Sequence, residues 1–370
     1  MVETKDFYNY LLSKELDFFA GVPDSFLKEL CSCIRGNSNG KSNIITANEG
    51  NAIAVVSGYH LSSGKYGVVY MQNSGIGNAV NPLLSLADEE VYSIPMLLIV
   101  GWRGEPNIKD EPQHKKQGKV TLSLFEVMGI ETVILDENYE EQVDYCYDYM
   151  EKNNKPIAII VKKDTFTEYK LEQEISEYTL TRERTLECII DNLNDNDYVV
   201  STTGKTTREI FEIREKNKQE HNKDFLTIGA MGHASSIAYG ISINTDKNVY
   251  CIDGDGSFLM HLGSLPIVAQ NANSNFKYVL INNGAHDSVG GQPTVAFDIM
   301  INEVLKAVGF KNVFEATTEE EVNNSMDSLK YSNELSALII YTKQGSRKDL
   351  GRPTISTIDN KLSFMKKIRE

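Results

Sequence analysis

Two short polar motifs, Gly254–Ser257 (GDGS) and Asn282–Asn283 (NN), combine residues that could hold a metal ion and a phosphate group. GDGS follows Val249–Ile252 (VYCI), an apolar run typical of a buried parallel strand, and its glycines let the backbone approach a ligand closely. Asp255 offers a carboxylate oxygen and Asn283 an amide oxygen, and both suit Mg²⁺ when water and phosphate oxygens complete its octahedron. The motifs therefore predict a magnesium–phosphate site, although both are also common turn sequences.

The residues after GDGS favour a diphosphate as the ligand. We expect a helix from about Phe258 to Asn271, and the positive end of its dipole would face the same group. GDGS followed by NN resembles the diphosphate-binding motif of thiamine-diphosphate enzymes. That resemblance implies a cofactor-binding loop at Gly254, Asp255, Gly256 and Ser257, and adds Ala285 to the metal ligands Asp255 and Asn283.

A second requirement of such enzymes is a carboxylate that hydrogen-bonds the aminopyrimidine ring of the cofactor. Glu49 fits this role, because it follows the strand-like run Asn43–Thr46 and begins an amphipathic helix that continues to about Leu61. Taken alone, a glutamate in a first helical turn is ordinarily a surface residue that complements the helix dipole. Together with GDGS and NN, Glu49 is predicted to be the activating acid.

A third element is the glycine-rich run Gly229–Ala234 (GAMGHA), which leads into a helix of small residues, Ser235–Ile241. In relatives, the bulky apolar residue at the position of Met231 lies under the cofactor and holds it bent. The backbone carbonyl at Gly229 would accept a hydrogen bond from the ring, and Gly232 and His233 would line the cofactor. The alternative is a glycine-rich helix entry in which methionine only fills a gap.

The longer motifs resemble those of the phosphonopyruvate decarboxylase family along essentially the whole chain. The matching runs are Gly21–Ser25, Arg103–Glu105, Asp110–His114, Ser201–Gly204, Asn282–Thr294 and Arg347–Thr354. The sulfopyruvate decarboxylases are close neighbours of this family. The resemblance implies thiamine diphosphate and Mg²⁺ as cofactors and the decarboxylation of 3-phosphonopyruvate to phosphonoacetaldehyde and CO₂, in phosphonate biosynthesis. Sulfopyruvate, another 2-oxo acid, or binding of the cofactor without turnover remain alternatives.

Composition excludes other classes of protein. The chain has 370 residues, of which 41% are hydrophobic and 24% charged, as in ordinary globular proteins. Its formal net charge of −15 argues against a nucleic-acid partner, which would need a basic face. Five cysteines without metal-ligand spacing suggest free thiols in a reducing cytoplasm. We found neither a signal peptide nor an apolar run long enough to span a membrane.

Strand-like and helix-like segments alternate throughout, which predicts an α/β fold with parallel sheets. The strand-like runs are Phe18–Val22, Asn43–Thr46, Gly67–Met71, Pro95–Val100, Glu131–Leu135, Pro156–Val161, Tyr198–Thr202, Phe225–Ile228, Val249–Ile252, Lys277–Ile281 and Ala337–Tyr341. The polar segment Thr165–Thr181 places a boundary near residue 175. We expect a pyrimidine-binding domain over residues 1–170, a diphosphate-binding domain over 180–370 and no middle domain. By resemblance, one active site is shared between two subunits, so the chain should self-associate.

Polar residues in loops extend the candidate site. His114 and His286 are predicted to donate hydrogen bonds to the substrate or to carry protons, although an isolated histidine is more often structural. In related enzymes an acid at a position like that of Asp24 reaches the reacting carbon, yet Asp24 also makes a good helix cap. Asn73 opens a glycine-containing loop beside the cofactor, where a plain helix cap explains it almost as well. Ser25 and Gln113 are predicted to contact the substrate.

A basic group is needed for the phosphonate. Gly204-Lys205-Thr206 resembles the end of a P-loop, but the earlier glycine of that motif is replaced by Val199, which argues against nucleotide hydrolysis. Lys205 and Arg208 are plausible anion contacts. Arg347 and Arg352, with Lys348 between them, form a second basic group, and arginine can bind a phosphonate in bidentate fashion. We predict the C-terminal group as the first choice.

Overall fold

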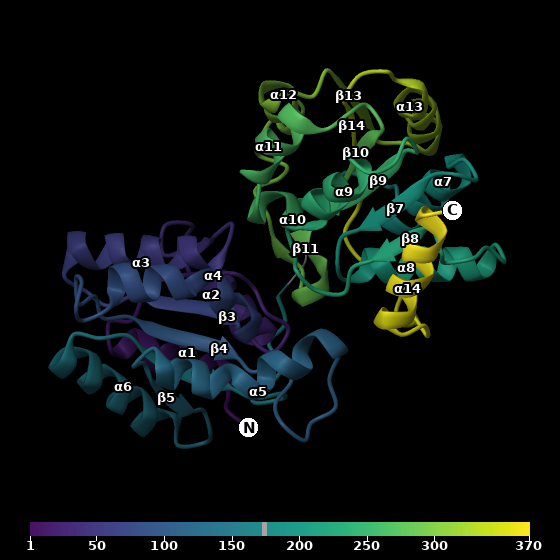
Figure 1. Cartoon of the computed structure of the whole chain (residues 1–370). Coiled ribbons are helices and arrows are strands. Elements are labelled where there is room, and N and C mark those ends of the chain that lie inside the picture. The colour runs from purple at the N-terminus through teal and green to yellow at the C-terminus, as the bar shows by residue number, and fades with distance from the viewer. Residues whose placement is uncertain (172–175) are drawn as a thin grey trace. The chain divides into compact units, whose positions relative to one another are not determined.

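The chain folds into two compact α/β units, each described here by itself. The computed structural model describes residues 1–171 and 176–370, and the units comprise Met1–Gln173 and Glu174–Glu370. Figure 1 shows the first unit in purple to blue-green and the second in teal through green to yellow. The predicted boundary near residue 175 lies outside the described residues.

The first unit is built on a six-stranded parallel sheet with the strand order β2-β1-β3-β4-β6-β5. The strands are β1 (Phe19–Gly21), β2 (Asn43–Ile45), β3 (Val68–Gln72), β4 (Leu97–Gly101), β5 (Glu131–Ile134) and β6 (Ile157–Val161). The helices are α1 (Thr4–Ser13), α2 (Lys28–Asn37), α3 (Glu49–Ser63), α4 (Ile76–Pro82), α5 (Pro112–Val127) and α6 (Tyr139–Asn153). Short turns η1 (Asn73–Gly75) and η2 (Leu83–Ala87) flank α4.

Both faces of this sheet are covered. Along β3, Val68 and Tyr70 pack into a core with α1, α2 and α6, whereas Val69 and Met71 pack into a second core with α3, α4 and α5. Because successive strand residues point to opposite faces, a strand buried on both sides must be apolar throughout. This explains why the strands could be recognised as continuous apolar runs.

The second unit repeats this architecture with the strand order β13-β14-β10-β9-β7-β8, and all its neighbouring strands are parallel. The strands are β7 (Tyr198–Ser201), β8 (Asp224–Leu226), β9 (Val249–Gly254), β10 (Phe276–Asn282), β13 (Asn312–Ala316) and β14 (Ser336–Tyr341), with a small antiparallel pair, β11 (Ala285–His286) and β12 (Gln292–Pro293). The helices are α7 (Arg182–Asn192), α8 (Lys205–Lys216), α9 (Ala234–Ser242), α10 (Asp255–Met260), α11 (Ser264–Asn271), α12 (Ile301–Val308), α13 (Glu319–Tyr331) and α14 (Thr357–Ile368); the turn η3 (Asp287–Val289) follows β11.

The predicted fold class is confirmed, with one correction inside the second unit. The helix expected over residues 258–271 is two helices, because the chain leaves α10 at His261 and starts α11 at Ser264. Pro266 explains the break, since in a continuous helix it would lack a donor and its ring would clash with the carbonyl of Leu262. The first helix also begins earlier than predicted, at Asp255.

In each unit, the predicted site residues follow strand ends on one edge of the sheet. Asp24 follows β1 and Glu49 follows β2, while Asp255 follows β9 and Asn283 follows β10. Ligands of open parallel sheets bind at this carboxyl edge. None of the helices in the described ranges is long and apolar enough to cross a membrane.

Candidate active site

Glu49 is the first residue of α3 and is 4% exposed. The N-cap Asn48 fixes the helix start by accepting a hydrogen bond from the Asn51 backbone at 3.0 Å. The Glu49 carboxylate accepts a hydrogen bond from Asn78 Nδ2 at 2.7 Å, and burial raises its pKa above the ordinary value although this bond opposes the rise. A Cβ at Gly75 would lie 2.2 Å from Glu49 Oε1. Glycine at 75 therefore makes room for a buried carboxylate whose pKa is raised.

Asp24 is also fully buried, in the loop after β1. It accepts hydrogen bonds from Gln72 Nε2 at 2.5 Å and from the Phe26 backbone at 2.8 Å, yet burial raises its pKa. A Cβ at Gly101, the last residue of β4, would come within 2.1 Å of Asp24 Oδ2. Two buried carboxylic groups, one at the start of α3 and one in the loop after β1, thus lie at the same edge of the sheet, and neither could be accommodated beside an alanine at these glycines.

The Asn73 side chain is held by hydrogen bonds within the first unit. Its Nδ2 donates to the Arg103 carbonyl at 2.8 Å and to Thr121 Oγ1 at 2.9 Å, while its Oδ1 accepts from the Arg103 backbone at 3.1 Å. The side chain therefore joins the ends of β3 and β4 to α5. This geometry favours a positioning role, and the direct cofactor contact that we predicted for Asn73 stays a prediction.

His114 and Gln113 lie in the first turn of α5, next to the loop after β4. His114 is 8% exposed, and burial together with the Arg103 guanidinium lowers its pKa to about 4. Its Nδ1 and the Gln113 Oε1 are buried without a hydrogen-bond partner among the described residues. A neutral imidazole with an unused nitrogen is suited to exchange a proton or hydrogen bond with a ligand.

In the second unit, Asp255 is 3% exposed at the start of α10. Burial raises its pKa to about 7, against the hydrogen bond that it accepts from Thr294 Oγ1, and Asp287 contributes to the rise. A buried carboxylate in a negative environment is costly unless a cation accompanies it. The surroundings of Asp255 are therefore chemically suited to a divalent metal ion.

The two asparagines of NN have different roles. Asn282 forms the turn, because its Oδ1 accepts from the Gly284 backbone at 3.0 Å and its Nδ2 donates to the Ala296 carbonyl at 3.0 Å. Asn283 Oδ1 accepts from the Ala285 backbone at 3.1 Å, and its Nδ2 donates to Asp287 Oδ2 at 2.9 Å. The predicted metal ligands Asn283 and Ala285 are thus adjacent in space.

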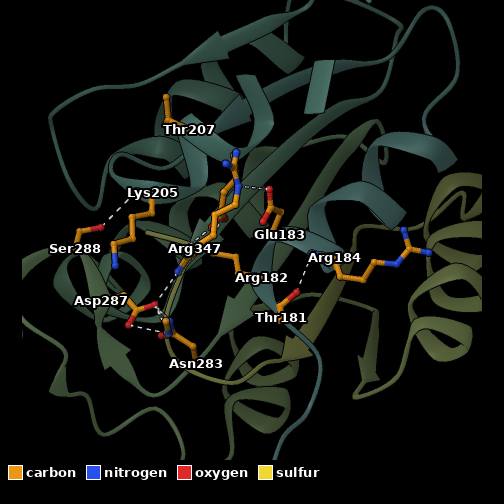
Figure 2. A network of polar contacts seen from close by, with 12 residues as sticks. Thr181, Arg182, Glu183, Arg184, Lys205, Thr207, Asn283, Asp287, Ser288 and Arg347 are labelled. Atoms are coloured by element: carbon orange, nitrogen blue, oxygen red, sulfur yellow. Dashed lines mark hydrogen bonds and ion pairs between the residues drawn. The ribbon is translucent and has the colours of Figure 1, made fainter. Parts of the chain in front are cut away.

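A buried network continues from Asn283 through Asp287, a residue that our sequence analysis did not single out. Asp287 accepts from Arg182 Nη1 at 2.9 Å and from the Gly345 backbone at 3.0 Å, and Figure 2 shows it between Asn283 and Arg182. Arg182 also binds both oxygens of Glu209, at 2.7 and 2.9 Å. The side chains of Arg182 and Glu209 are 6% and 1% exposed, so the loop after β10 is fixed by a desolvated ion-pair chain.

Other predicted cofactor residues gather around Gly256. A Cβ there would lie 2.8 Å from His286 Nδ1 and 3.2 Å from Met231 Cε, so glycine leaves space between these side chains. Burial lowers the pKa of His286 to about 4. The structure therefore brings Met231, Gly256 and His286 together, as expected for parts of one site.

The same loop brings in a histidine that the sequence did not indicate. The Gly232 backbone donates to Ser257 Oγ at 3.0 Å, which joins the GAMGHA and GDGS loops. His233 and His261 have ring centroids 4.4 Å apart, and His261 Nε2 is buried without a partner in the described part of the chain. The break after α10 turns His261 toward this loop, and a sequence pattern that predicts one continuous helix gives no signal of it.

The predicted anion-binding residues differ in their surroundings. Lys205 starts α8, burial lowers its pKa, and its side chain extends toward Asp287 in Figure 2. Arg347 pairs with Glu183 at 2.9 Å, with Glu212, and with Asp349 at 3.2 Å. Three carboxylates around Arg347 leave it a poor anion receptor. Arg208 and Arg352 each have polar partners in the structure.

These residues fit thiamine diphosphate with Mg²⁺. Within the described ranges no group of three or more His, Cys, Asp or Glu residues could hold a metal ion by itself. Mg²⁺ commonly uses only one or two carboxylates together with phosphate oxygens and water, which matches Asp255, the Asn283 amide and the Ala285 carbonyl. In the first unit, the buried carboxyl of Glu49, whose pKa is raised by burial, suits the aminopyrimidine.

Comparison with known proteins supports thiamine diphosphate as the cofactor. Residues 4–124 match the family described as "Thiamine pyrophosphate enzyme, N-terminal TPP binding domain", and residues 202–340 match the corresponding C-terminal TPP binding domain. Thiamine pyrophosphate is another name for thiamine diphosphate. Each match lies within one of the two compact units.

Curated relatives align over nearly the whole chain. Phosphonopyruvate decarboxylase of Streptomyces hygroscopicus is 31% identical over 96% of this chain and 91% of its own length, and that of Streptomyces viridochromogenes is 30% identical over 91% and 87%. Sulfopyruvate decarboxylase subunit alpha of Methanocaldococcus jannaschii is 33% identical over 45% of this chain and 96% of that subunit. The chain therefore belongs to the phosphonopyruvate decarboxylase family of thiamine pyrophosphate enzymes.

Proposed function

We propose that this protein decarboxylates 3-phosphonopyruvate to phosphonoacetaldehyde and CO₂, as a step in phosphonate biosynthesis in the cytoplasm. The observation that carries the proposal is the buried carboxyl of Glu49, held by Asn78 against Gly75, in a chain whose full-length relatives are named phosphonopyruvate decarboxylases. Five buried free thiols agree with a reducing compartment.

When bound, the cofactor supplies a thiazolium ring that accepts the electron pair released as CO₂ leaves. The chain supplies proton transfer and positioning. The buried carboxyl of Glu49 would exchange a proton with the pyrimidine ring, and burial raises its pKa, which favours the protonated form more than in an exposed carboxyl. Asp24, whose pKa is raised, is suited to deliver a proton at the reacting carbon, and His114, whose pKa is lowered, is suited to accept one.

The metal and diphosphate would be held by the second unit. Asp255 Oδ, Asn283 Oδ1 and the Ala285 carbonyl are the predicted Mg²⁺ ligands, and the buried environment of Asp255 supports this assignment. Gly254, Gly256 and Ser257 would surround the diphosphate, with Gly229, Met231, Gly232 and His233 along the rest of the cofactor. Substituting Asp255 with alanine should weaken Mg²⁺ and cofactor binding together, as measured by calorimetry.

CO₂ release tests the reaction and its selectivity. Purified protein with thiamine diphosphate and Mg²⁺ is assayed on phosphonopyruvate, sulfopyruvate and pyruvate. We expect the highest kcat/KM for phosphonopyruvate. A higher kcat/KM for sulfopyruvate would favour a sulfopyruvate decarboxylase instead. No turnover of any of the three substrates would favour a protein that binds the cofactor without catalysis.

We also propose that the active site is shared between two subunits, the first unit of one chain facing the second unit of another. The sulfopyruvate decarboxylase subunit alpha named above is a separate chain that aligns with 45% of this one. This supports the view that the two halves of such an enzyme can belong to different chains. The test mixes two inactive variants, Glu49→Gln and Asp255→Ala, after subunit exchange. A shared site regains activity in mixed oligomers, because one of their sites carries neither substitution. No recovery at any ratio would place both half-sites in one chain.

A further inference from the structure

The Arg103 guanidinium, just beyond β4 in the first unit, is fixed on two sides. Its Nε and Nη2 donate to the two oxygens of Asp110 at 2.8 and 2.5 Å, and its Nη1 donates to Ser25 Oγ at 2.9 Å. A guanidinium has five N–H donors, so one N–H of Nη1 and one of Nη2 have no acceptor in the described parts of the chain. These two donors are fixed in place before any ligand arrives.

The partners of Arg103 are themselves held firmly. Burial opposes ionisation of Asp110, but the Arg103 guanidinium and the backbone N–H groups of Glu111 and Gly104 hold its pKa below the ordinary value. The guanidinium also lies over the Phe26 ring, 5.0 Å from its centroid. Because Ser25 Oγ accepts from Arg103, its own hydroxyl proton can be donated to a third group.

The start of α5, next to Arg103, carries exposed lysines as well as the carboxylates of Asp110 and Glu111. Lys115 and Lys116 lie exposed in its first turns, where the helix dipole disfavours cations. His114, whose pKa is lowered in part by the Arg103 guanidinium, is buried, and its Nδ1 has no partner among the described residues. Asp110 and Glu111 offset part of this positive charge, so it is the two fixed donors of Arg103 and the Nδ1 of His114, with the exposed lysines beside them, that point to an anionic ligand.

We propose that Arg103 and Ser25, at the start of α5, bind the phosphonate group of the substrate, an inference that rests on the proposed function. The substrate's other anion is its carboxylate, whose negative charge leaves it as CO₂ forms. A cation bound there would stabilise the ground state more than the transition state and would slow the reaction. A fixed guanidinium is better used on the phosphonate, whose charge persists. All three nitrogens of Arg347 pair with carboxylates, whereas Nη1 of Arg103 pairs with the neutral Ser25 hydroxyl, so Arg347 is the less suitable residue.

The test measures a ratio of substrates in the holoenzyme, kcat/KM for phosphonopyruvate over kcat/KM for pyruvate. Arg103→Met removes the donors, and Arg103→Lys keeps the charge without the fork. Because a hydrogen bond to a charged group contributes about 1.5 to 3 kcal/mol, we expect Arg103→Met to lower the ratio roughly 10-fold to 100-fold. The lysine variant should fall between it and wild type, and the matched control Arg347→Met should keep the wild-type ratio. An equal loss on both substrates, or a changed ratio only in Arg347→Met, would overturn the proposal.

Two further measurements keep the result interpretable. Lys115 and Lys116 are exposed, so the double variant Lys115→Gln/Lys116→Gln leaves the core undisturbed. It should raise KM for phosphonopyruvate several-fold, with a larger effect at low salt, and leave KM for pyruvate unchanged. An unchanged KM would count against the site. Calorimetry with phosphonoacetate separates this inference from the proposed function. Suppose that wild type releases no CO₂ but binds phosphonoacetate, and that Arg103→Met fails to bind it. The proposed decarboxylation is then wrong, and the phosphonate site at Arg103 is supported. Equal binding of phosphonoacetate by both proteins would rule out the phosphonate site.

Discussion

Asn283 Nδ2 donates a hydrogen bond to Asp287 Oδ2 at 2.9 Å, and this contact determines which way the Asn283 amide faces. With its nitrogen held by a carboxylate, the amide must present Oδ1, the atom that we predict to bind the metal, toward Ala285 and away from Asp287. Asp287 is held in turn by Arg182 and the Gly345 backbone. Groups that orient a metal ligand in this way are commonly as important as the ligand itself.

Replacing Asp287 should therefore weaken metal binding without removing a ligand. For Asp287→Ala we expect Mg²⁺ affinity to fall about 10-fold to 100-fold, as is typical when an outer partner of a ligand is lost. The measurement is the Mg²⁺ concentration that gives half-maximal CO₂ release at saturating cofactor. Asp298→Asn, an exposed carboxylate between β12 and α12, is the control and should match wild type. Unaltered Mg²⁺ dependence in Asp287→Ala would show that Asn283 needs no such support.

Two glycines separated by one residue provide a matched test of the Glu49 pocket. A Cβ at Gly75 would overlap the Glu49 carboxylate, whereas a Cβ at Gly77 would meet nothing within 4 Å. Neither glycine has a positive φ, so alanine brings no backbone strain at either position. We expect Gly75→Ala to displace Glu49 and lower kcat at least 10-fold by loss of acid–base catalysis. Gly77→Ala should keep wild-type kcat, and equal activities in the two variants would contradict this view of the pocket.

Glu49→Gln should separate catalysis from folding. Loss of proton transfer at the pyrimidine should reduce kcat about 100-fold to 10,000-fold. Burial raises the folded-state pKa of Glu49, so the carboxyl favours folding below its ordinary pKa and this contribution is lost as pH rises through the raised value. The neutral glutamine avoids that loss, so the cofactor-free variant should melt at or above the wild-type temperature at pH 8. A lower melting temperature would show that the carboxylate stabilises the fold.

The sequence predicted the strands well because both sheets are buried on both faces. Each predicted run overlaps a strand of the structure, and the main strand it missed, β13, shows why. Asn312–Ala316 lies at the sheet edge with mostly half-exposed side chains, so it has no continuous apolar run to recognise. The helix break at His261 was missed because helical periodicity continues across it, although Pro266 was visible.

The site was predictable only where one motif carries the chemistry. Glu49, Asp255 and Asn283 stand in short motifs, but the groups that set their properties come from distant segments. Arg182 reaches Asp287 from 105 positions earlier in the chain, and Arg103 reaches Ser25 across 78. Arg347 was predicted as an anion contact because a sequence shows charges without their partners. Its partner Glu183 lies 164 positions away, on α7.

His114 should make the fold sensitive to acid. Its pKa is lowered from the ordinary 6.5 to about 4, because burial and the Arg103 guanidinium disfavour the imidazolium, with Asp110 partly opposing them. The unfolded chain binds a proton at this residue near pH 6.5, so the stability contributed by the neutral imidazole is complete above that pH. It is lost progressively as pH falls toward 4.

Between pH 7.5 and pH 5 this single group should account for about 2 kcal/mol of unfolding free energy at most. Other groups also titrate in that interval, so the informative quantity is a difference between proteins. Urea unfolding of wild type and His114→Gln at both pH values gives the loss of stability in each. We expect the variant to lose less on acidification, since glutamine keeps a polar side chain of similar reach and does not titrate. If wild type and variant lose the same amount, His114 is protonated in the fold as readily as in the unfolded chain. It would then be unsuited to accept a proton at the reacting carbon.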